Sequence, residues 1–449
     1  MSQTAPSKTE VRASESVAAV AKRAREASRA LARLSDERRK AVLLAAAGAI
    51  EAGRAQILEA NALDCAAAEP SVASGSMSAA MLKRLRLTES GIAGMATHVR
   101  EVAGLPDPLG RTLMATELDD NLTLFRESCP LGVVGVVFES RPDVVPQVAS
   151  LALKSGNALI LKGGAEATHT NETLVRLWRA ALEKLPEVPG DSVQLLHTRA
   201  DVLELLSLDR DVDLIIPRGS YELVRYIMEH SRIPVLGHGE GICHVYVDRS
   251  ADMEKALDIA YDAKVQYPAV CNAAETLLVH EDIAAKFLPQ AVARLKKAGV
   301  EIRADAKTAS LLPEEKIVRA TEDDWSTEYG DMILAIKIVS DIDSAIDHIN
   351  RYGSRHTDAI VTEDDAAAGK FMDEVDSAGV FQNASTRFAD GFRYGFGAEV
   401  GISNSKLHAR GPMGLEGLTT YKYKLYGNGH TVAPYAKGEK RFKHRRLDA

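Results

Sequence analysis

The chain has 449 residues, and at about 150 residues per domain this length predicts about three domains, or two with large insertions. Hydrophobic residues make up 46% and charged residues 26% of the chain, which excludes a collagen, a disordered tail protein and a disulfide scaffold. The formal net charge of −8 argues against nucleic acid or an anionic membrane as a partner.

The four cysteines are Cys65, Cys129, Cys243 and Cys271, and no two of them stand at a C-x-x-C spacing. The spacing favours neither a zinc ribbon nor a redox pair, and we expect no metal site. The longest apolar run, 131–138, is too short to span a bilayer, and no secretory signal is visible. We therefore expect a cytoplasmic protein with reduced thiols.

The residues before Gly110 are rich in alanine, leucine and arginine and predict helices. We expect two or three amphipathic helices over 9–67 and another helical region over 80–104. The alternating residues 112–127 then predict a hairpin or another excursion from the core.

From residue 131 the pattern changes to strands that alternate with helices. The runs LGVVGVVF at 131–138 and VDLII at 212–216 predict buried strands. Between them we expect strands over 158–161 and 193–196 and helices over 144–156, 168–185 and 200–207. A second alternating set runs from about 245 to 382. This alternation predicts two α/β lobes, each with a parallel sheet and right-handed crossovers.

The C-terminal part differs from both lobes. Strand-like residues follow residue 412, and the chain ends in the basic segment 437–446. We expect this segment to be a solvated terminus rather than a nucleic-acid-binding arm.

Several common motifs are absent from the sequence. There is no G-x-G-x-x-G, no Walker A motif, no H-E-x-x-H and no G-x-S-x-G. An α/β protein without these motifs must bind its ligands and perform its chemistry in another way.

Cys271, in the segment YPAVCNAAET at 267–276, gives the strongest local indication of chemistry. It follows a proline-containing loop and precedes a strand, so we expect the backbone N–H of the next residue to be free. A thiolate there can attack an acyl carbon while the N–H group stabilises the oxyanion. For Cys65, Cys129 and Cys243 we keep the commoner interpretation of a structural cysteine.

Two segments of the first lobe offer weaker indications of a nucleotide site. Gly219 and Ser220 follow a strand and open an amphipathic helix, where free N–H groups can hold a pyrophosphate or simply form a helix cap. Lys162 ends another strand and can reach a nucleotide ribose or 2′-phosphate, or simply face solvent.

The glycine-rich segment 395–417 holds three basic side chains within five residues, Lys406, His408 and Arg410. Such a loop can bind a phosphate or a carboxylate. The alternative is a mobile surface loop.

Several long segments together are far more specific than any single motif. They are CPLGVVGVVFESRPDV (129–144), LALKSGNALILKGGAEATHTN (151–171), GICHVYVD (241–248), YPAVCNAAETLLVH (267–280), VSDIDSAIDHINRYGSRHTDAI (339–360) and AEVGISNSKLHARGPMGLEGLTTYKY (398–423). On these segments the chain resembles the γ-glutamyl phosphate reductases, also called glutamate-5-semialdehyde dehydrogenases, of proline biosynthesis. That family belongs to the aldehyde dehydrogenase superfamily.

The resemblance implies an aldehyde dehydrogenase-like α/β fold with two parallel-sheet lobes and a small β oligomerisation flap. Residues 1–108 and 128–246, with part of 391–411, would form the cofactor lobe, and 247–390 the catalytic lobe. The flap would comprise 109–127 and 412–435, and 436–449 would be a basic C-terminal tail.

The resemblance also implies roles for single residues. Cys271 matches the nucleophile, and Lys162 matches the lysine that holds the adenosine ribose. Gly219 and Ser220 match the Gly-Ser pair at the pyrophosphate helix. Glu328 in TEYGD matches the glutamate that contacts the nicotinamide ribose.

The chain departs from the oxidising members of the superfamily at two positions. His238 stands in place of their glutamate base, and the asparagine oxyanion donor after the first strand is absent. Asn272 and the backbone N–H of Cys271 remain as candidate oxyanion donors. A reductase of an acyl phosphate gains from excluding hydrolytic water. The candidates for binding the substrate anion are Lys406, His408, Arg410, Arg218, Arg141 and His238.

The implied reaction is the NADPH-dependent reduction of L-glutamyl 5-phosphate to L-glutamate 5-semialdehyde, through a cysteine thioester and with release of phosphate. The residues alone leave NADP versus NAD open, because Glu166 near Lys162 would disfavour a 2′-phosphate if it faced the site. A homo-oligomer, and coupling to the glutamate 5-kinase that supplies the labile acyl phosphate, are also implied. Another aldehyde or acyl-phosphate dehydrogenase, or a non-catalytic binding protein on this fold, remain alternatives.

Overall fold

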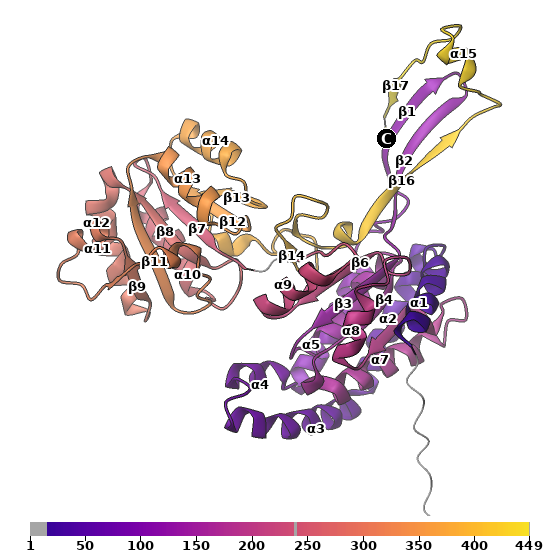
Figure 1. Cartoon of the computed structure of the whole chain (residues 1–449), viewed down its shortest axis with the longest axis horizontal. Helices are drawn as coiled ribbons and strands as arrows, with labels where there is room; N and C mark the ends of the chain where they lie inside the picture. Colours follow the sequence, from indigo (N-terminus) through magenta and orange to yellow (C-terminus); the bar gives the residue numbers. More distant parts are fainter. Residues whose placement is uncertain (1–15, 238–239, 449) are drawn as a thin grey trace, which may run out of the picture.

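The computed structural model describes residues 16–237 and 240–448, so His238 lies outside the described residues. Two α/β lobes lie side by side, and a small antiparallel sheet projects from the first of them (Figure 1). The main sheet of each lobe is parallel, so the α/β class predicted from the alternation of strands and helices is confirmed.

The sheet of the first lobe has the strand order β5-β4-β3-β6. Its strands are β3 (Val133–Phe138), β4 (Ala158–Lys162), β5 (Val193–Leu196) and β6 (Leu214–Arg218). The chain builds outward from β3 through β4 to β5 and then returns to place β6 on the other side of β3. In such sheets, ligands bind at the carboxyl ends of the strands where the order reverses.

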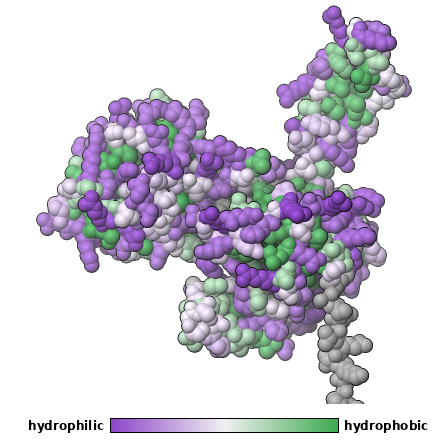
Figure 2. All heavy atoms as spheres, in the orientation of Figure 1, coloured by the Kyte–Doolittle hydropathy of each residue, from purple (hydrophilic) through white to green (hydrophobic). Residues whose placement is uncertain are grey.

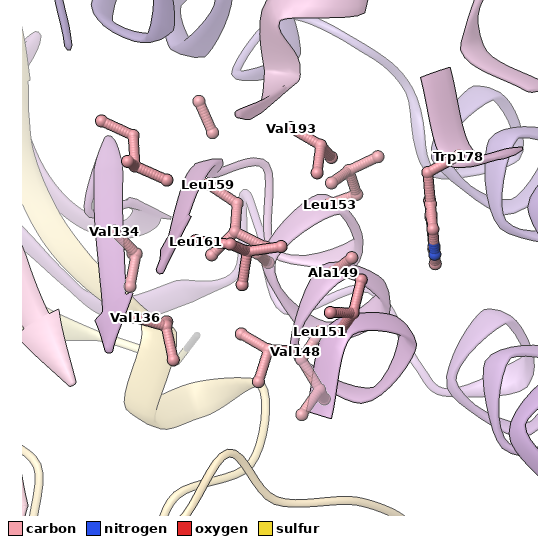
Figure 3. Close-up of a cluster of buried hydrophobic side chains, with 14 of the residues drawn as sticks. Val134, Val136, Val148, Ala149, Leu151, Leu153, Leu159, Leu161, Trp178 and Val193 are labelled. Carbon is pink, nitrogen blue, oxygen red and sulfur yellow. The ribbon is translucent and has the colours of Figure 1, made fainter. Parts of the chain in front are cut away.

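Helices cover this first sheet, and their apolar faces form its core. β3 is buried at every position, and Figure 3 shows Val134 and Val136 of β3 beside Leu159 and Leu161 of β4, with Val148 nearby. The helices of the first lobe are α1 (Val17–Leu31), α2 (Asp36–Ala52), α3 (Arg54–Ala73), α4 (Ala79–Leu85), α5 (Glu89–Gly104), α6 (Val144–Lys154), α7 (Thr168–Leu182), α8 (Arg199–Leu205) and α9 (Tyr221–His230).

Among the described residues, no single helix is long and apolar enough to cross a membrane. The helices α2 and α3, bent by 66° at their break, pass that test only as a pair. Both of them pack against α7.

The second lobe holds a seven-stranded parallel sheet with the order β10-β9-β11-β8-β7-β12-β13. Its strands are β7 (Cys243–Val247), β8 (Ala274–His280), β9 (Glu301–Ala304), β10 (Val318–Arg319), β11 (Ile333–Val339), β12 (Thr357–Val361) and β13 (Gly379–Gln382), and its helices are α10 (Met253–Val265), α11 (Glu281–Lys297), α12 (Ala306–Leu311), α13 (Ile342–Tyr352) and α14 (Asp365–Glu374). The predicted lobe boundary at residue 246 falls inside β7. Because β7 pairs with β8 and β12, the second lobe begins before that boundary.

The projecting sheet, which we call the flap, has the antiparallel order β16-β2-β1-β17. Its strands are β1 (Thr112–Asp119), β2 (Leu122–Pro130), β16 (Thr419–Tyr426) and β17 (Arg445–Leu447), with α15 (Ala433–Ala436) between the last two. Exposed Tyr421, Tyr423 and Leu425 lie on the edge strand β16. Figure 2 shows apolar side chains gathered on this flap.

The basic C-terminal segment 437–446 is exposed, as predicted from its composition, but it is not a free terminus. Residues 445–447 form β17, which pairs with β1. Arg445 Nε donates to Glu117 Oε2 at 2.6 Å, and Lys443 pairs with both Glu117 and Asp120. The pairing could not be predicted because the acidic residues that bind this basic segment lie 323 or more positions earlier, and its charge alone does not reveal them.

Deletion of residues 437–449 should loosen one edge of the flap. Without β17, the amides of β1 that face it lose their partners, so hydrogen exchange across 112–119 should accelerate at least about tenfold. Exchange in the pair of β2 and β16 serves as the internal control, because β17 does not touch it. Unchanged protection of β1 in the truncated protein would contradict the assignment of β17.

Candidate active site

Cys271 lies in the turn between α10 and β8 and is half-buried. The turn packs closely on the segment that enters the second lobe. A Cβ placed on Gly241 would lie 2.1 Å from the Cys271 carbonyl oxygen and 2.4 Å from its Cα. The buried thiol of Cys243 also donates to that carbonyl, with an Sγ–O distance of 3.2 Å. The close approach of Gly241 and the hydrogen bond from Cys243 therefore fix the backbone of Cys271.

The amide groups around Cys271 fall into two kinds. The backbone N–H groups of Cys271 and Asn272 donate no hydrogen bond within the part of the chain that the structure describes. The side chain of Asn272 is buried, and its Nδ2 donates to the Ala389 carbonyl at 2.8 Å. That side chain therefore fastens the turn to its neighbour, while the two backbone donors stay available.

Two arginines interact electrostatically with Cys271. Arg218 ends β6 in the first lobe and donates to Gln147 Oε1 at 2.9 Å. Burial and then Arg141 lower the pKa of Arg218 to about 10, while Glu399, Asp143 and, least of all, Cys271 oppose this shift. Arg387 is 7% exposed in the second lobe and donates to Gln266, and burial also lowers its pKa.

Sequence reasoning missed Arg387 altogether. The only available signal was its place shortly after β13, at the carboxyl end of a parallel strand, where ligands of such sheets are bound. Arg141 differs from it, since this candidate is exposed and pairs with Asp143 at 2.9 Å.

Glu328 interacts electrostatically with Glu240 and Glu275. It lies between the short helix 323–326 and β11. Burial, and then Glu328, raise the pKa of Glu240. Burial raises the pKa of Glu275 to about 7, although its partner Lys264 opposes this shift.

The predicted pyrophosphate position holds a carboxylate in this structure. Ser220 caps α9, and its backbone N–H donates to Glu139 Oε2 at 2.8 Å. The same oxygen would lie 2.4 Å from a Cβ on Gly219, so this position accepts an anion only because residue 219 has no side chain. Glu139 follows β3, so this anion seat lies where the strand order reverses.

Lys162 and Glu166 lie near the same end of the first sheet. Lys162 is half-buried at the end of β4, and its ammonium has no partner among the described residues. Glu166 Oε1 accepts from both the backbone N–H and the hydroxyl of Ser140, each at 2.6 Å. Its carboxylate is therefore occupied in holding the turn after β3.

The basic residues of the glycine-rich segment lie at two places, and Arg410 contributes to both. Lys406 and Arg410 both pair with Asp376, at 2.6 Å and 3.1 Å, and Arg355 approaches the same carboxylate at 3.8 Å. His408 instead accompanies Arg410 in the lining of a cavity of about 390 Å³ near the base of the flap, and its Nε2 lies 3.1 Å from the Thr419 carbonyl.

The half-buried cysteine, the free backbone donors beside it and the anion seat at the switch of a parallel sheet agree with an enzyme of the aldehyde dehydrogenase type. The family model described as the aldehyde dehydrogenase family matches residues 2–314. This chain belongs to that family, within it to the γ-glutamyl phosphate reductases, and is an oxidoreductase.

The narrower family rests on relatives that share nearly the whole chain. The γ-glutamyl phosphate reductase of Natronomonas pharaonis is 56% identical over 93% of this chain and 95% of its own length. The protein of that name from Synechococcus sp. (strain JA-3-3Ab) is 54% identical over 98% of this chain and 96% of its own. The crystal structure of the Thermotoga maritima γ-glutamyl phosphate reductase is 42% identical, with a TM-score of 0.90, over 93% of this chain and 100% of that one.

Replacing Gly241 with alanine should disable the enzyme by moving the Cys271 turn. The added Cβ would overlap backbone atoms rather than a flexible side chain, and a misplacement of about 1 Å at the reacting centre costs roughly 100-fold in turnover. The matched control is Gly369→Ala on α14, where nothing lies within 4 Å of the added atom. Steady-state turnover and thermal unfolding measure both variants, and normal turnover in Gly241→Ala would refute the close contact.

Proposed function

We propose that this chain reduces L-glutamyl 5-phosphate to L-glutamate 5-semialdehyde with NADPH and releases phosphate, as a step of L-proline biosynthesis. The observation that carries the proposal is Cys271 with free backbone donors beside it, and the charges of Arg218 and Arg387 interact electrostatically with this residue. A thiol in that setting suits an anionic acyl substrate. We infer the substrate from the names of the relatives, and we infer the type of reaction from the residues of the site.

Atoms of this chain support the cofactor proposal. Enzymes of the aldehyde dehydrogenase family use nicotinamide cofactors, and the glyceraldehyde-3-phosphate dehydrogenase of Methanocaldococcus jannaschii, an 18% identical neighbour in fold, holds NADP. In this chain Glu139 already seats a negative oxygen on the Ser220 N–H, which is the place a pyrophosphate needs. Lys162 would hold the adenosine ribose, and Glu328 the nicotinamide ribose. Glu166 accepts from Ser140 and keeps its charge, so titration with both cofactors decides between NADP and NAD.

The reaction begins at the thiolate of Cys271. Its sulfur attacks the acyl carbon of the substrate. The bond between that carbon and the phosphate oxygen then breaks, so that phosphate departs and a thioester of Cys271 remains. The backbone N–H groups of Cys271 and Asn272 stabilise the oxyanion, so the oxyanion role predicted for Asn272 falls to its backbone. The bound cofactor supplies the hydride. The resulting thiohemiacetal oxyanion collapses to the aldehyde and frees the thiolate.

The substrate's two anionic ends need separate partners. We assign the phosphate to Arg218 and Arg387, because the charges of these guanidinium groups interact with Cys271. We assign the α-carboxylate to Lys406 and Arg410, which hold the carboxylate of Asp376 in this structure. A substrate carboxylate would take the place of a group of the same chemistry.

The assembly of the enzyme and its place in the cell are further parts of the proposal. The unpaired edge of β16 suits pairing with a second copy of the chain, as the flap of the related family implies. We propose a cytoplasmic homo-oligomer that receives its labile acyl phosphate from a glutamate 5-kinase.

Replacing Cys271 with alanine should abolish the reaction while leaving the cofactor site intact. Without the nucleophile, turnover should fall at least about ten-thousand-fold. The assay follows NADPH-dependent phosphate release from glutamyl phosphate, with Cys129→Ala in the flap as the matched control. Retained phosphate release in Cys271→Ala would refute the mechanism. Parallel assays with aspartyl phosphate, acetyl-CoA and simple aldehydes test the substrate, and preference for one of these would point to another member of the superfamily.

Replacing Glu139 with glutamine should tighten cofactor binding. The carboxylate competes with the pyrophosphate for the Ser220 N–H and repels it, so the Kd for NADPH should fall about fivefold when this charge is removed. Glu222→Gln, in the first turn of the same helix, is the matched control because its carboxylate is exposed and makes no such bond. Fluorescence titration of both variants with NADPH and NADH measures the effect. An unchanged or weaker affinity of Glu139→Gln would place the pyrophosphate elsewhere.

A further inference from the structure

A buried ion pair lies at the base of the Cys271 turn. Lys264 is the next-to-last residue of α10, and Glu275 is the second residue of β8. Their Nζ and Oε2 atoms are 2.6 Å apart, and both side chains have no exposed surface. The pair therefore closes the ends of the connection that carries Cys271.

The second oxygen of Glu275 reaches a different loop. Oε1 accepts from the backbone N–H of Gly330 at 3.2 Å, two residues after Glu328. The ring of Tyr329, between them, lies 6.0 Å from Lys264 Nζ. The hydroxyl of Tyr329 donates to Asp324 at 2.7 Å. Glu275 thus joins the turn of the nucleophile to the loop that carries the proposed nicotinamide-ribose ligand.

Stability alone gives little reason for such a pair. Removing two charges from water is costly, and well-packed apolar residues of similar volume are often as stabilising as a buried ion pair. A buried pair does enforce one geometry, because any other arrangement leaves a charge without its partner. In this protein the pair constrains the position of the Cys271 turn relative to the loop that carries Glu328.

We propose that Lys264 and Glu275 are positioning residues that hold the Cys271 turn in register with the Glu328 loop. They touch neither substrate nor cofactor, and they act through the backbone that carries both groups. The inference rests on the proposed function, since the value of this register is that the nucleophile and the reduced nicotinamide meet the same acyl carbon.

The test replaces the pair with apolar residues in Lys264→Met/Glu275→Leu. Hydrogen exchange of the cofactor-free protein is measured first, and the Gly330 amide and the turn 266–273 should exchange about tenfold faster. The interior of β8 should keep its protection. In kinetics, kcat should fall about tenfold and the KM for NADPH should rise severalfold, because both loops lose their common anchor.

The matched control is Lys154→Met/Asp36→Leu. It removes another pair with a fully buried lysine, 2.5 Å apart in the first lobe and outside both loops. It should change neither the exchange of those two segments nor the kinetic constants. Unchanged exchange at Gly330 and 266–273 in the Lys264/Glu275 variant would overturn the proposal, and so would faster exchange spread evenly over the whole second lobe.

Glu275→Gln provides a second variant if the double replacement fails to fold. The two bonds end on different oxygens of Glu275, and in a glutamine one of these oxygens is replaced by an NH2 group, which donates and cannot accept. If the remaining oxygen stays with the charged Lys264, the Gly330 N–H loses its acceptor. Exchange at Gly330 should rise in this variant, and protection equal to wild type would overturn the proposal. Because exchange needs neither substrate nor cofactor, its result is independent of Cys271→Ala. An active Cys271→Ala enzyme would refute the proposed function without touching the link between the loops.

Discussion

The site depends on one close contact, that of Gly241 with the backbone of Cys271. Because residue 241 has no side chain, the segment entering the second lobe passes directly beneath the nucleophile's turn. The next residue, Ile242, donates its N–H to Ser354 Oγ at 2.8 Å, and the Ser354 carbonyl accepts from Asn404 at 2.7 Å. The contact therefore connects the passage between the lobes, the nucleophile and the loop of Lys406 and Arg410.

The chain is acidic as a whole, yet the ligands proposed for it are anions. Local placement resolves this, because a few cations are concentrated where the ligands bind while the surplus acids lie elsewhere. Arg218 and Arg387 owe their lowered pKa values first to burial, which also strengthens their interaction with any bound anion. At two of the places where an anion is proposed to bind, a carboxylate of the chain already holds the donors, Glu139 at one and Asp376 at the other.

Much of this fold could be predicted because local pattern and burial agree. The strand expected at 193–196 is β5, and the buried run at 131–138 contains β3. Cys271 could be found from its loop-to-strand setting. β17, Arg387 and the partner of Lys264 could not, because each depends on a residue distant in sequence or on a side-chain direction that one chain's pattern does not encode. The roles implied for Lys162 and Glu328 came from resemblance and stay predictions.

The small strand β17 limits how the molecule can assemble. A sheet with two open edges can add further strands at both sides and grow without end. β17 covers the β1 edge with three residues, two of them arginines, and leaves only β16 as a long edge. Two copies that join through β16 form a closed pair with no free long edge. The residues of β17 thus leave a short, arginine-bearing edge on the β1 side of the sheet, opposite the exposed tyrosines of β16.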